Sequence, residues 1–206
     1  MDDADFFSWY GHWTPLRPTE VADLLGGGFP YWIVGGWAIE AFTGRSRDHD
    51  DIDVTFLARD FDAVRERLRG YHLWDTNDGV LRPLLPGAAM PEEEGQMWLR
   101  KDAASPWLVD LLLTPAEGDD WVCKRDRRIR RPLTGIGWTG AEGAPYLRPE
   151  IVLLMKAKHD QPKDRADLEA ALPMLDPAAR AWLADSLRVA HPGHPWLETL
   201  AGNSAP

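Results

Sequence analysis

Cysteine is almost absent from this sequence of 206 residues, since Cys123 is its single example. One thiol cannot form an intramolecular disulfide, and it cannot supply the several thiolates of a cysteine-rich metal site. The sequence therefore excludes a disulfide-stapled fold and a cysteine-based zinc site. It is typical of a protein that works in a reducing compartment, and we expect the cytoplasm.

Long apolar runs are missing as well. No stretch approaches the roughly 18 apolar residues that a membrane-spanning helix needs. The first residues, Met1 to Asp5, are acidic and lead into no apolar segment, so we predict no signal peptide. We therefore expect no membrane partner.

Basic residues are outnumbered, because 23 Lys and Arg stand against 33 Asp and Glu and give a net charge of −10. Such a surface repels phosphate backbones, so we expect no nucleic-acid partner. It would attract a cationic small molecule, although solubility alone also explains the charge. The stretch from Lys124 to Arg131 is basic, and it is either a solvated β-ribbon or a segment that binds triphosphate or nucleic acid.

The remaining composition is that of a globular protein, with 44% hydrophobic residues and eleven Trp to fill a core. Helix and strand patterns are mixed up to Leu147 and helical after it, which predicts one domain over 1–147 and a helical subdomain over 148–206. The spacing predicts helices over 19–25, 37–43, 60–68, 150–159, 163–172 and 177–190. Period-2 and apolar runs predict strands over 31–34, 51–57, 71–75, 80–84, 96–100, 108–113, 121–123 and 127–131.

An Asp-x-Asp pair opens the predicted strand 51–57. Alternation along a strand places Asp51 and Asp53 on one face and turns Ile52 and Val54 the other way, into the core. Two close carboxylates repel each other unless a cation or a proton lies between them. Since Mg²⁺ binds through one or two carboxylates together with substrate phosphates, the pair indicates a magnesium site.

A glycine pair precedes these carboxylates. Gly35 and Gly36 lie between a predicted strand and a predicted helix, where backbone N–H groups can approach a phosphate closely. Arg45 and Arg47 follow the helix and would add contacts to the same phosphates. His49 shares the strand face of Asp51 by parity, and it either orients a carboxylate, contacts phosphate or is structural.

A third carboxylate, Asp110, is the one charge in an otherwise apolar strand. It is costly there unless it is paired or bound to metal. Each feature alone has an ordinary explanation, since a Gly-Gly is usually a turn and an Asp-x-Asp is often a solvated face. Their order along the chain favours a metal–nucleotide site.

In this order the residues resemble the nucleotidyltransferase superfamily that includes DNA polymerase beta. More closely, they resemble the aminoglycoside 2″-nucleotidyltransferases and the related lincosamide nucleotidyltransferases. The residues that carry this resemblance are Gly35, Gly36, Trp37, Ala38, Ile39, Glu40, Gly44, Arg45, Arg47, His49, Asp51, Ile52 and Asp53. Glu40 stands where those enzymes commonly carry Asp, and the central region 76–143 shows no clear match, so the acceptor is not carried over.

The resemblance implies an α+β nucleotidyltransferase fold, with a mixed β-sheet, flanking helices and a C-terminal helical bundle. Residues 1–147 would be the catalytic domain. It implies transfer of a nucleoside monophosphate from an NTP, with ATP expected first, to a hydroxyl, and release of pyrophosphate. Two Mg²⁺ ions would be held by Asp51, Asp53 and Asp110, and Asp110 would alternatively serve as general base. The residues expected to bind the nucleotide are Gly35, Gly36, Arg45, Arg47, His49 and Lys156.

The block from Leu147 to Asp167 resembles the C-terminal helices of uncharacterised members. In that block Lys156 or Lys158 would reach the triphosphate from a neighbouring helix. The alternative is a structural network in which these lysines pair with Asp164 and Asp167.

Three functions fit the sequence. The first is nucleotidyl transfer to a small molecule, an aminoglycoside or a lincosamide, with the acidic loop at 92–94 either lining its pocket or solvated. The second is an antitoxin-type enzyme that adenylylates a partner protein, docked on exposed Trp9, Trp13 or Trp196. The third is a non-catalytic nucleotide-binding module, which the presence of all three carboxylates argues against.

Overall fold

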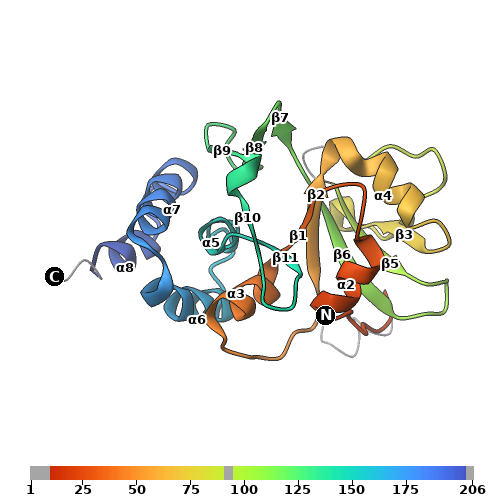
Figure 1. Cartoon of the computed structure of the whole chain (residues 1–206), viewed down its shortest axis with the longest axis horizontal. Helices are drawn as coiled ribbons and strands as arrows, with labels where there is room; N and C mark the ends of the chain where they lie inside the picture. Colours follow the sequence, from red (N-terminus) through yellow and green to blue (C-terminus); the bar gives the residue numbers. More distant parts are fainter. Residues whose placement is uncertain (1–9, 91–94, 203–206) are drawn as a thin grey trace.

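The computed structural model describes residues 10–90 and 95–202, which build a mixed β-sheet with helices around it (Figure 1). Trp9 and the 92–94 loop, which the sequence suggested for docking and for the acceptor, lie outside the described residues. The α-helices are α2 (Pro18–Leu25), α3 (Gly35–Thr43), α4 (Phe61–Arg67), α5 (Pro149–Lys156), α6 (Pro162–Ala171), α7 (Pro177–Ala190) and α8 (Trp196–Gly202). The strands are β1 (Tyr31–Ile33), β2 (Asp53–Leu57), β3 (His72–Asp75), β4 (Arg82–Pro83), β5 (Gln96–Arg100), β6 (Trp107–Thr114), β7 (Ala116–Glu117), β8 (Asp120–Val122), β9 (Arg130–Pro132), β10 (Gly137–Thr139) and β11 (Pro145–Leu147).

Eight strands form the main sheet in the order β10-β11-β1-β2-β6-β5-β3-β4, and β7-β8-β9 form a smaller one. The main sheet is mixed, because β1 pairs parallel with β11 and β2 pairs parallel with β6, whereas the other neighbours are antiparallel. The long apolar strand β6 lies between β2 and β5. The middle of the sheet therefore carries Asp110 next to the strand that begins with Asp53.

The two faces of β2 have different partners. Val54 and Phe56 are fully buried, and they point to the opposite face from Asp53 because side chains alternate along a strand. Helix α4 lies on one side of β2 and helix α5 on the other (Figure 1). Helix α5 also packs against α3, α6 and α7, and α7 packs against α8. The C-terminal helices are therefore in contact with helix α3 of the first part of the chain.

The expected fold class is confirmed, since the chain is α+β with a mixed sheet, flanking helices and several C-terminal helices. The division at 147/148 stays a prediction. Four of these elements escaped the sequence patterns: the two-residue strand β7, the short strands β10 and β11 in a segment rich in Gly and Pro, and helix α8. None of the helices among the described residues has the length and apolar character to cross a membrane.

Two boundaries near the glycine pair differ from expectation. Helix α3 begins at Gly35 itself, whereas the sequence pattern predicted a break there and a helix from Trp37. Strand β2 begins at Asp53, so Asp51 lies just before the strand and is exposed. The two glycines are therefore the first two residues of the helix, and Gly35 approaches Asp53 directly.

Candidate active site

Asp53 and Asp110 stand side by side in the sheet. They are paired positions of the parallel strands β2 and β6, and the N–H of Asp110 donates to the carbonyl of Ile52 at 2.9 Å. On the other edge of β2, the N–H of Val34 donates to the carbonyl of Asp53 at 2.9 Å. Because paired residues share a face, both carboxylates project to the side of the sheet that helix α5 covers.

Asp110 is buried, with 5% of its surface exposed. Its Oδ2 accepts hydrogen bonds from Gln96 Nε2 at 2.7 Å and from Trp98 Nε1 at 3.1 Å. Its Oδ1 is buried and accepts none within the described part of the chain. Burial, followed by the charge of Asp53, raises the pKa of Asp110 well above its usual range, although the two hydrogen bonds oppose the shift. A buried acceptor with an open lone pair suits a cation.

Asp53 is partly buried, and a neighbouring negative charge disfavours its ionised form. Burial, followed by the charge of Asp51, raises its pKa to about 7, whereas the charges of Lys156, Lys163 and Arg47 oppose the shift. The three carboxylates are thus electrostatically coupled, whereas the sequence pattern predicted such repulsion only between Asp51 and Asp53.

Gly35 allows the backbone of α3 to approach the side chain of Asp53 closely. Its φ is +64°, a left-handed conformation that side chains rarely adopt. A Cβ at Gly35 would lie 2.1 Å from Asp53 Oδ2, so only glycine allows this approach. The electropositive first turn of the helix consequently lies beside the carboxylate, where a phosphate and a cation would share one space.

The loop that carries Asp51 is held by Trp37. The indole N–H of Trp37 donates to the carbonyl of Asp51 at 3.1 Å. His49 stacks on the same indole, with ring centroids 4.2 Å apart, and its Nε2 lies 2.9 Å from Glu40 Oε2. Burial opposes ionisation of Glu40, but hydrogen bonds led by that from His49 hold its pKa below the usual value. In this structure His49 contacts a carboxylate of α3 and orients the loop.

Gly36 makes room for the basic side chains of the loop. A Cβ there would lie 2.0 Å from the guanidinium of Arg47 and 2.8 Å from the ring of His49. The guanidinium of Arg47 donates to the carbonyl of Asp48 at 3.0 Å and lies 3.4 Å from Asp167. Arg47 and His49 therefore reach the start of α3, whereas Arg45 is exposed beyond the end of that helix.

Lys156 is engaged by carboxylates of helix α6. Its Nζ lies 3.0 Å from Asp164 Oδ1 and 2.9 Å from Asp167 Oδ2, and all three side chains are largely buried. This is the ion-pair network that the sequence left as the alternative to triphosphate contact. Lys158, by contrast, is exposed.

A pocket of about 350 Å³ lies beside Asp53, which we call the catalytic pocket. Its lining residues are Val34, Gly35, Asp53, Leu112, Val152, Met155, Lys156, His159, Gln161, Lys163 and Asp164. His159, Gln161 and Lys163 were not singled out as site residues, because exposed polar residues on a helical segment look like any solvated face. Lys163 lies in the block from Leu147 to Asp167 that resembles the C-terminal helices of uncharacterised members, and this resemblance was the signal that could have identified it.

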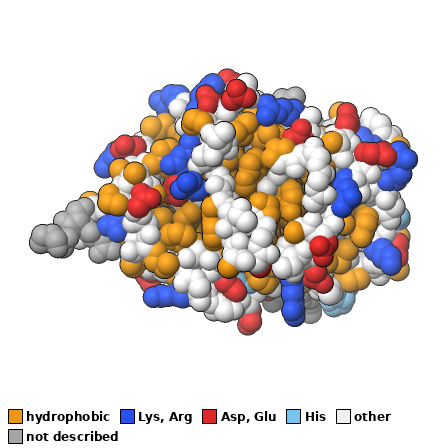
Figure 2. Space-filling model, viewed as in Figure 1, with side chains coloured by type: hydrophobic (Ala, Val, Ile, Leu, Met, Phe, Trp, Pro, Cys, Tyr) orange, Lys and Arg blue, Asp and Glu red, His pale blue; other side chains and the backbone are white. Residues whose placement is uncertain are grey.

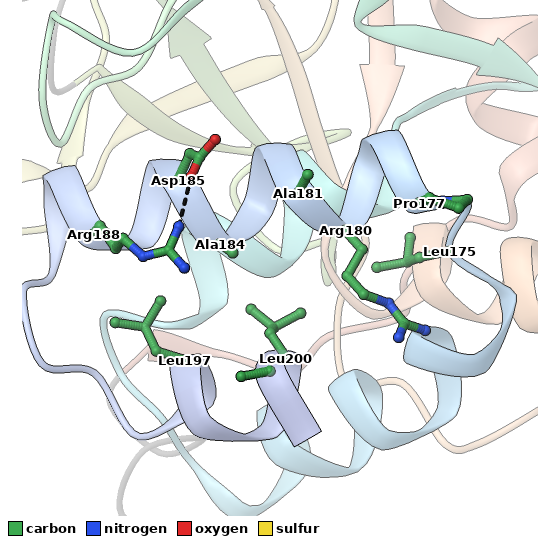
Figure 3. A pocket seen from close by; sticks show the side chains of 10 residues that line it. Leu175, Pro177, Arg180, Ala181, Ala184, Asp185, Arg188, Leu197 and Leu200 are labelled. Atoms are coloured by element: carbon green, nitrogen blue, oxygen red, sulfur yellow. Dashed lines mark hydrogen bonds and ion pairs between the residues drawn. The ribbon is translucent and has the colours of Figure 1, made fainter. Parts of the chain in front are cut away.

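A wider pocket of about 640 Å³ lies between helices α7 and α8 (Figure 3). Alanine and leucine side chains line it, and an ion pair between Arg188 and Asp185 lies at its edge. It contains none of the predicted site residues, so size alone does not identify the site. On the face shown in Figure 2, charged side chains of both signs are interspersed among apolar ones.

The donor chemistry of the three carboxylates fits a divalent cation. Among residues 10–90 and 95–202, no three acidic, imidazole or thiol groups are already arranged around one point that could hold an ion. The unpartnered Oδ1 of Asp110 and the raised pKa values of Asp53 and Asp110 nevertheless mark a place where positive charge would be stabilising. Asp51, Asp53 and Asp110 are the residues that would hold it.

Comparisons with known proteins match the first part of the chain. Residues 19–83 match the sequence model of the aminoglycoside-2''-adenylyltransferase family. A 2''-aminoglycoside nucleotidyltransferase from Escherichia coli is 45% identical over 56 residues, which cover 25% of this chain and 32% of that relative. One from Klebsiella pneumoniae is 51% identical over 45 residues, 20% of this chain and 25% of the relative. The resemblance predicted from the sequence is confirmed for this segment, which spans about a third or less of the relatives' length.

Two solved structures have a similar arrangement. The solution structure of the antibiotic-resistance factor ANT(2'')-Ia has a TM-score of 0.49 and 20% identity, covering 84% of this chain and 88% of that one. The lincomycin-bound crystal structure of the lincosamide adenylyltransferase LnuA has a TM-score of 0.46 and 17% identity, covering 82% and 96%. The segment matched by the family contains Gly35, Asp51 and Asp53, whereas Asp110 and Lys156 lie beyond it.

Proposed function

We propose that the chain is a Mg²⁺-dependent nucleotidyltransferase that moves a nucleoside monophosphate from an NTP, with ATP the first candidate, to a hydroxyl of a small molecule. One observation carries the proposal: Asp53 and Asp110 are paired on parallel strands, and the first turn of α3 lies against Asp53 through Gly35. Phosphate, cation and acceptor hydroxyl could thus meet at one face of the sheet.

Each residue has a proposed role. Asp51, Asp53 and Asp110 would hold Mg²⁺, for which two ions are expected, and bound Mg²⁺ would neutralise the phosphates and stabilise the leaving pyrophosphate. The backbone of Gly35 and Gly36 would bind phosphate at the start of α3. Asp110 is also the candidate to take the proton of the acceptor hydroxyl, because it lies beside Asp53 and its Oδ1 accepts no hydrogen bond within the described part of the chain.

The proposed acceptor follows from the antibiotics on which the similar proteins act or which they bind. The family is described by its action on aminoglycosides, and one structural neighbour was solved with lincomycin bound. We therefore propose a hydroxylated antibiotic as the acceptor. The buried single thiol of Cys123 is compatible with a reducing environment, and we propose the cytoplasm as the place of action.

A pyrophosphate-release screen tests the proposal. Each of the four NTPs is incubated with Mg²⁺ and a panel of aminoglycosides and lincosamides, and pyrophosphate is measured. We expect release with at least one pair, and none with Asp53→Ala. Transfer of label from α-labelled ATP to a co-purified protein would instead identify a protein-modifying enzyme, and Mg²⁺-dependent ATP binding without release would identify a binding module.

A further inference from the structure

The basic stretch from Lys124 to Arg131 is mostly neutralised within the fold. It forms the connection between the antiparallel strands β8 and β9 and the beginning of β9. The pairs are Arg127 and Arg130 with Glu117, Arg128 with Asp126, and Arg131 with Glu150. These four arginines are structural, and Arg131 also lies over the ring of Trp182. The solvated β-ribbon that the sequence allowed therefore accounts for this part of the stretch.

Arg125 differs from its neighbours. It is exposed and forms no ion pair with any residue that the structure describes. Together with Lys124 it lines a second pocket of about 540 Å³, which we call the hairpin pocket. The other residues around this pocket are Val34, Thr55, Gln96, Leu112, Leu113, Thr114, Cys123, Met155, Lys158 and His159.

The hairpin pocket continues the catalytic pocket. Val34, Leu112, Met155 and His159 line both, so the two are halves of one cleft between the sheet and helix α5. Thr55 lies two residues after Asp53 on the same face of β2, which is about 7 Å along the strand. A nucleotide with its α-phosphate beside the carboxylates would reach the hairpin pocket with its terminal phosphates.

The charge of the hairpin pocket has one sign. Within the described lining, the ionised side chains are Lys124, Arg125 and Lys158, with His159 as a titratable neighbour and no carboxylate among them. Arg125 follows strand β8 and Lys158 follows helix α5, so two elements far apart in the sequence bring their cations to the same pocket. Cations that separate elements bring to one pocket are a usual composition of a phosphate site.

We propose that the hairpin pocket is a polyphosphate-binding subsite in which Arg125 and Lys158 contact terminal phosphates. The inference deepens the proposed function and rests on it for the source of the phosphate. That source is the β- and γ-phosphates of the nucleotide, or a phosphate group carried by the acceptor. The same cation pair would bind either one.

Calorimetric binding distinguishes these sources. The double variant R125A/K158A is titrated with inorganic pyrophosphate, ATP and AMP, with and without Mg²⁺, beside wild type. Arg128→Ala is the matched control, because Arg128 lies in the same basic stretch but is paired with Asp126 and is not among the residues that line the pocket. We expect pyrophosphate and ATP to bind about tenfold more weakly to the double variant, AMP to bind unchanged, and the control to match wild type.

Weaker pyrophosphate binding with unchanged ATP binding would assign the subsite to a phosphate on the acceptor. The proposal is overturned if pyrophosphate binds the double variant as well as it binds Arg128→Ala, because the charge lost would then have no local effect. The outcome is separable from the proposed function. If the wild-type protein binds pyrophosphate through Arg125 and Lys158 but transfers no nucleotide, the proposed subsite is supported and the proposed enzymatic function is contradicted.

Discussion

Asp53 and Asp110 occupy paired positions on neighbouring parallel strands, close enough that the charge of Asp53 raises the pKa of Asp110. Such an arrangement costs stability when both carboxylates are ionised, and a divalent cation relieves that cost. A fold that keeps two coupled carboxylates next to a helix start is organised for binding, since packing alone would favour apolar residues there.

The first prediction concerns pH and Asp53. Its pKa is about 7 in the folded chain against an ordinary 3.8, so between these values the folded state holds a proton that the unfolded state has lost. The contribution of Asp53 to stability is therefore full below about pH 4 and is lost as the pH rises to about 7. The side-chain amide of Asn does not ionise in this range, so the Asp53→Asn variant should lack this pH dependence of stability.

Urea unfolding of the wild type and Asp53→Asn at about pH 5 and about pH 8, without divalent cations, measures the difference. The wild type should lose more stability than the variant over this range, and Mg²⁺ should restore stability to the wild type only. Parallel pH profiles for the two proteins would contradict the prediction. Nucleotide transfer by the variant should be at least about a hundredfold slower, because a metal ligand is gone.

The second prediction compares the glycine that begins helix α3 with the glycine that follows its last residue. Gly35→Ala places a Cβ 2.1 Å from Asp53 Oδ2, whereas Gly44, with nearly the same φ of +67°, has open space around its missing side chain. Both substitutions carry the left-handed strain of about 1 kcal/mol. Gly35→Ala alone should also abolish Mg²⁺-dependent ATP binding. Equal loss of ATP binding in both variants, measured by calorimetry, would show that strain and not contact is responsible.

The site was predictable where chemistry depends on local sequence. Gly35 and Asp53 lie within twenty positions of one another, and the local pattern was enough to predict that they lie close together. Asp51 lies before strand β2 and not on it, so strand alternation does not account for its position. Asp110 was selected as a candidate because a single charged residue in an apolar strand is costly unless it is paired or bound to a metal. The parallel pairing of β6 with β2 was not predictable, because it depends on the long crossover between Leu57 and Trp107.

The parts that escaped prediction depend on long-range packing. The ion pairs of Lys156 join helix α5 to carboxylates on α6, and sequence spacing allowed them only as an alternative. The strands β10 and β11 contain three residues each and are ordered by pairing, β11 with β1 and β10 with β11, so their own sequence carries little strand signal. The separation of Arg125 from its paired neighbours likewise appears only when the hairpin is folded against the cleft.

The third prediction tests the loop that carries Asp51. Trp37→Phe keeps an aromatic ring for His49 to stack on but removes the N–H that donates to the Asp51 carbonyl at 3.1 Å. Loss of one such bond costs about 1 kcal/mol, so Mg²⁺-dependent ATP binding should weaken about fivefold while the fold is kept. Trp182→Phe on α7 is the control, and equal affinities of the two variants in a titration would refute a positioning role for Trp37.

The fourth prediction separates two lysines of the catalytic pocket. Lys156→Met leaves Asp164 buried without its cation and leaves Asp167 with Arg47 alone, so it should lower the free energy of unfolding by about 3 kcal/mol. Lys163 is exposed and its charge acts on Asp53, so Lys163→Met should keep its stability and bind ATP about tenfold more weakly. Urea unfolding and ATP titration of both variants give the test. A stable Lys156→Met that fails to bind ATP would reverse the assignment and place the ammonium of Lys156 on the triphosphate, as the sequence first suggested.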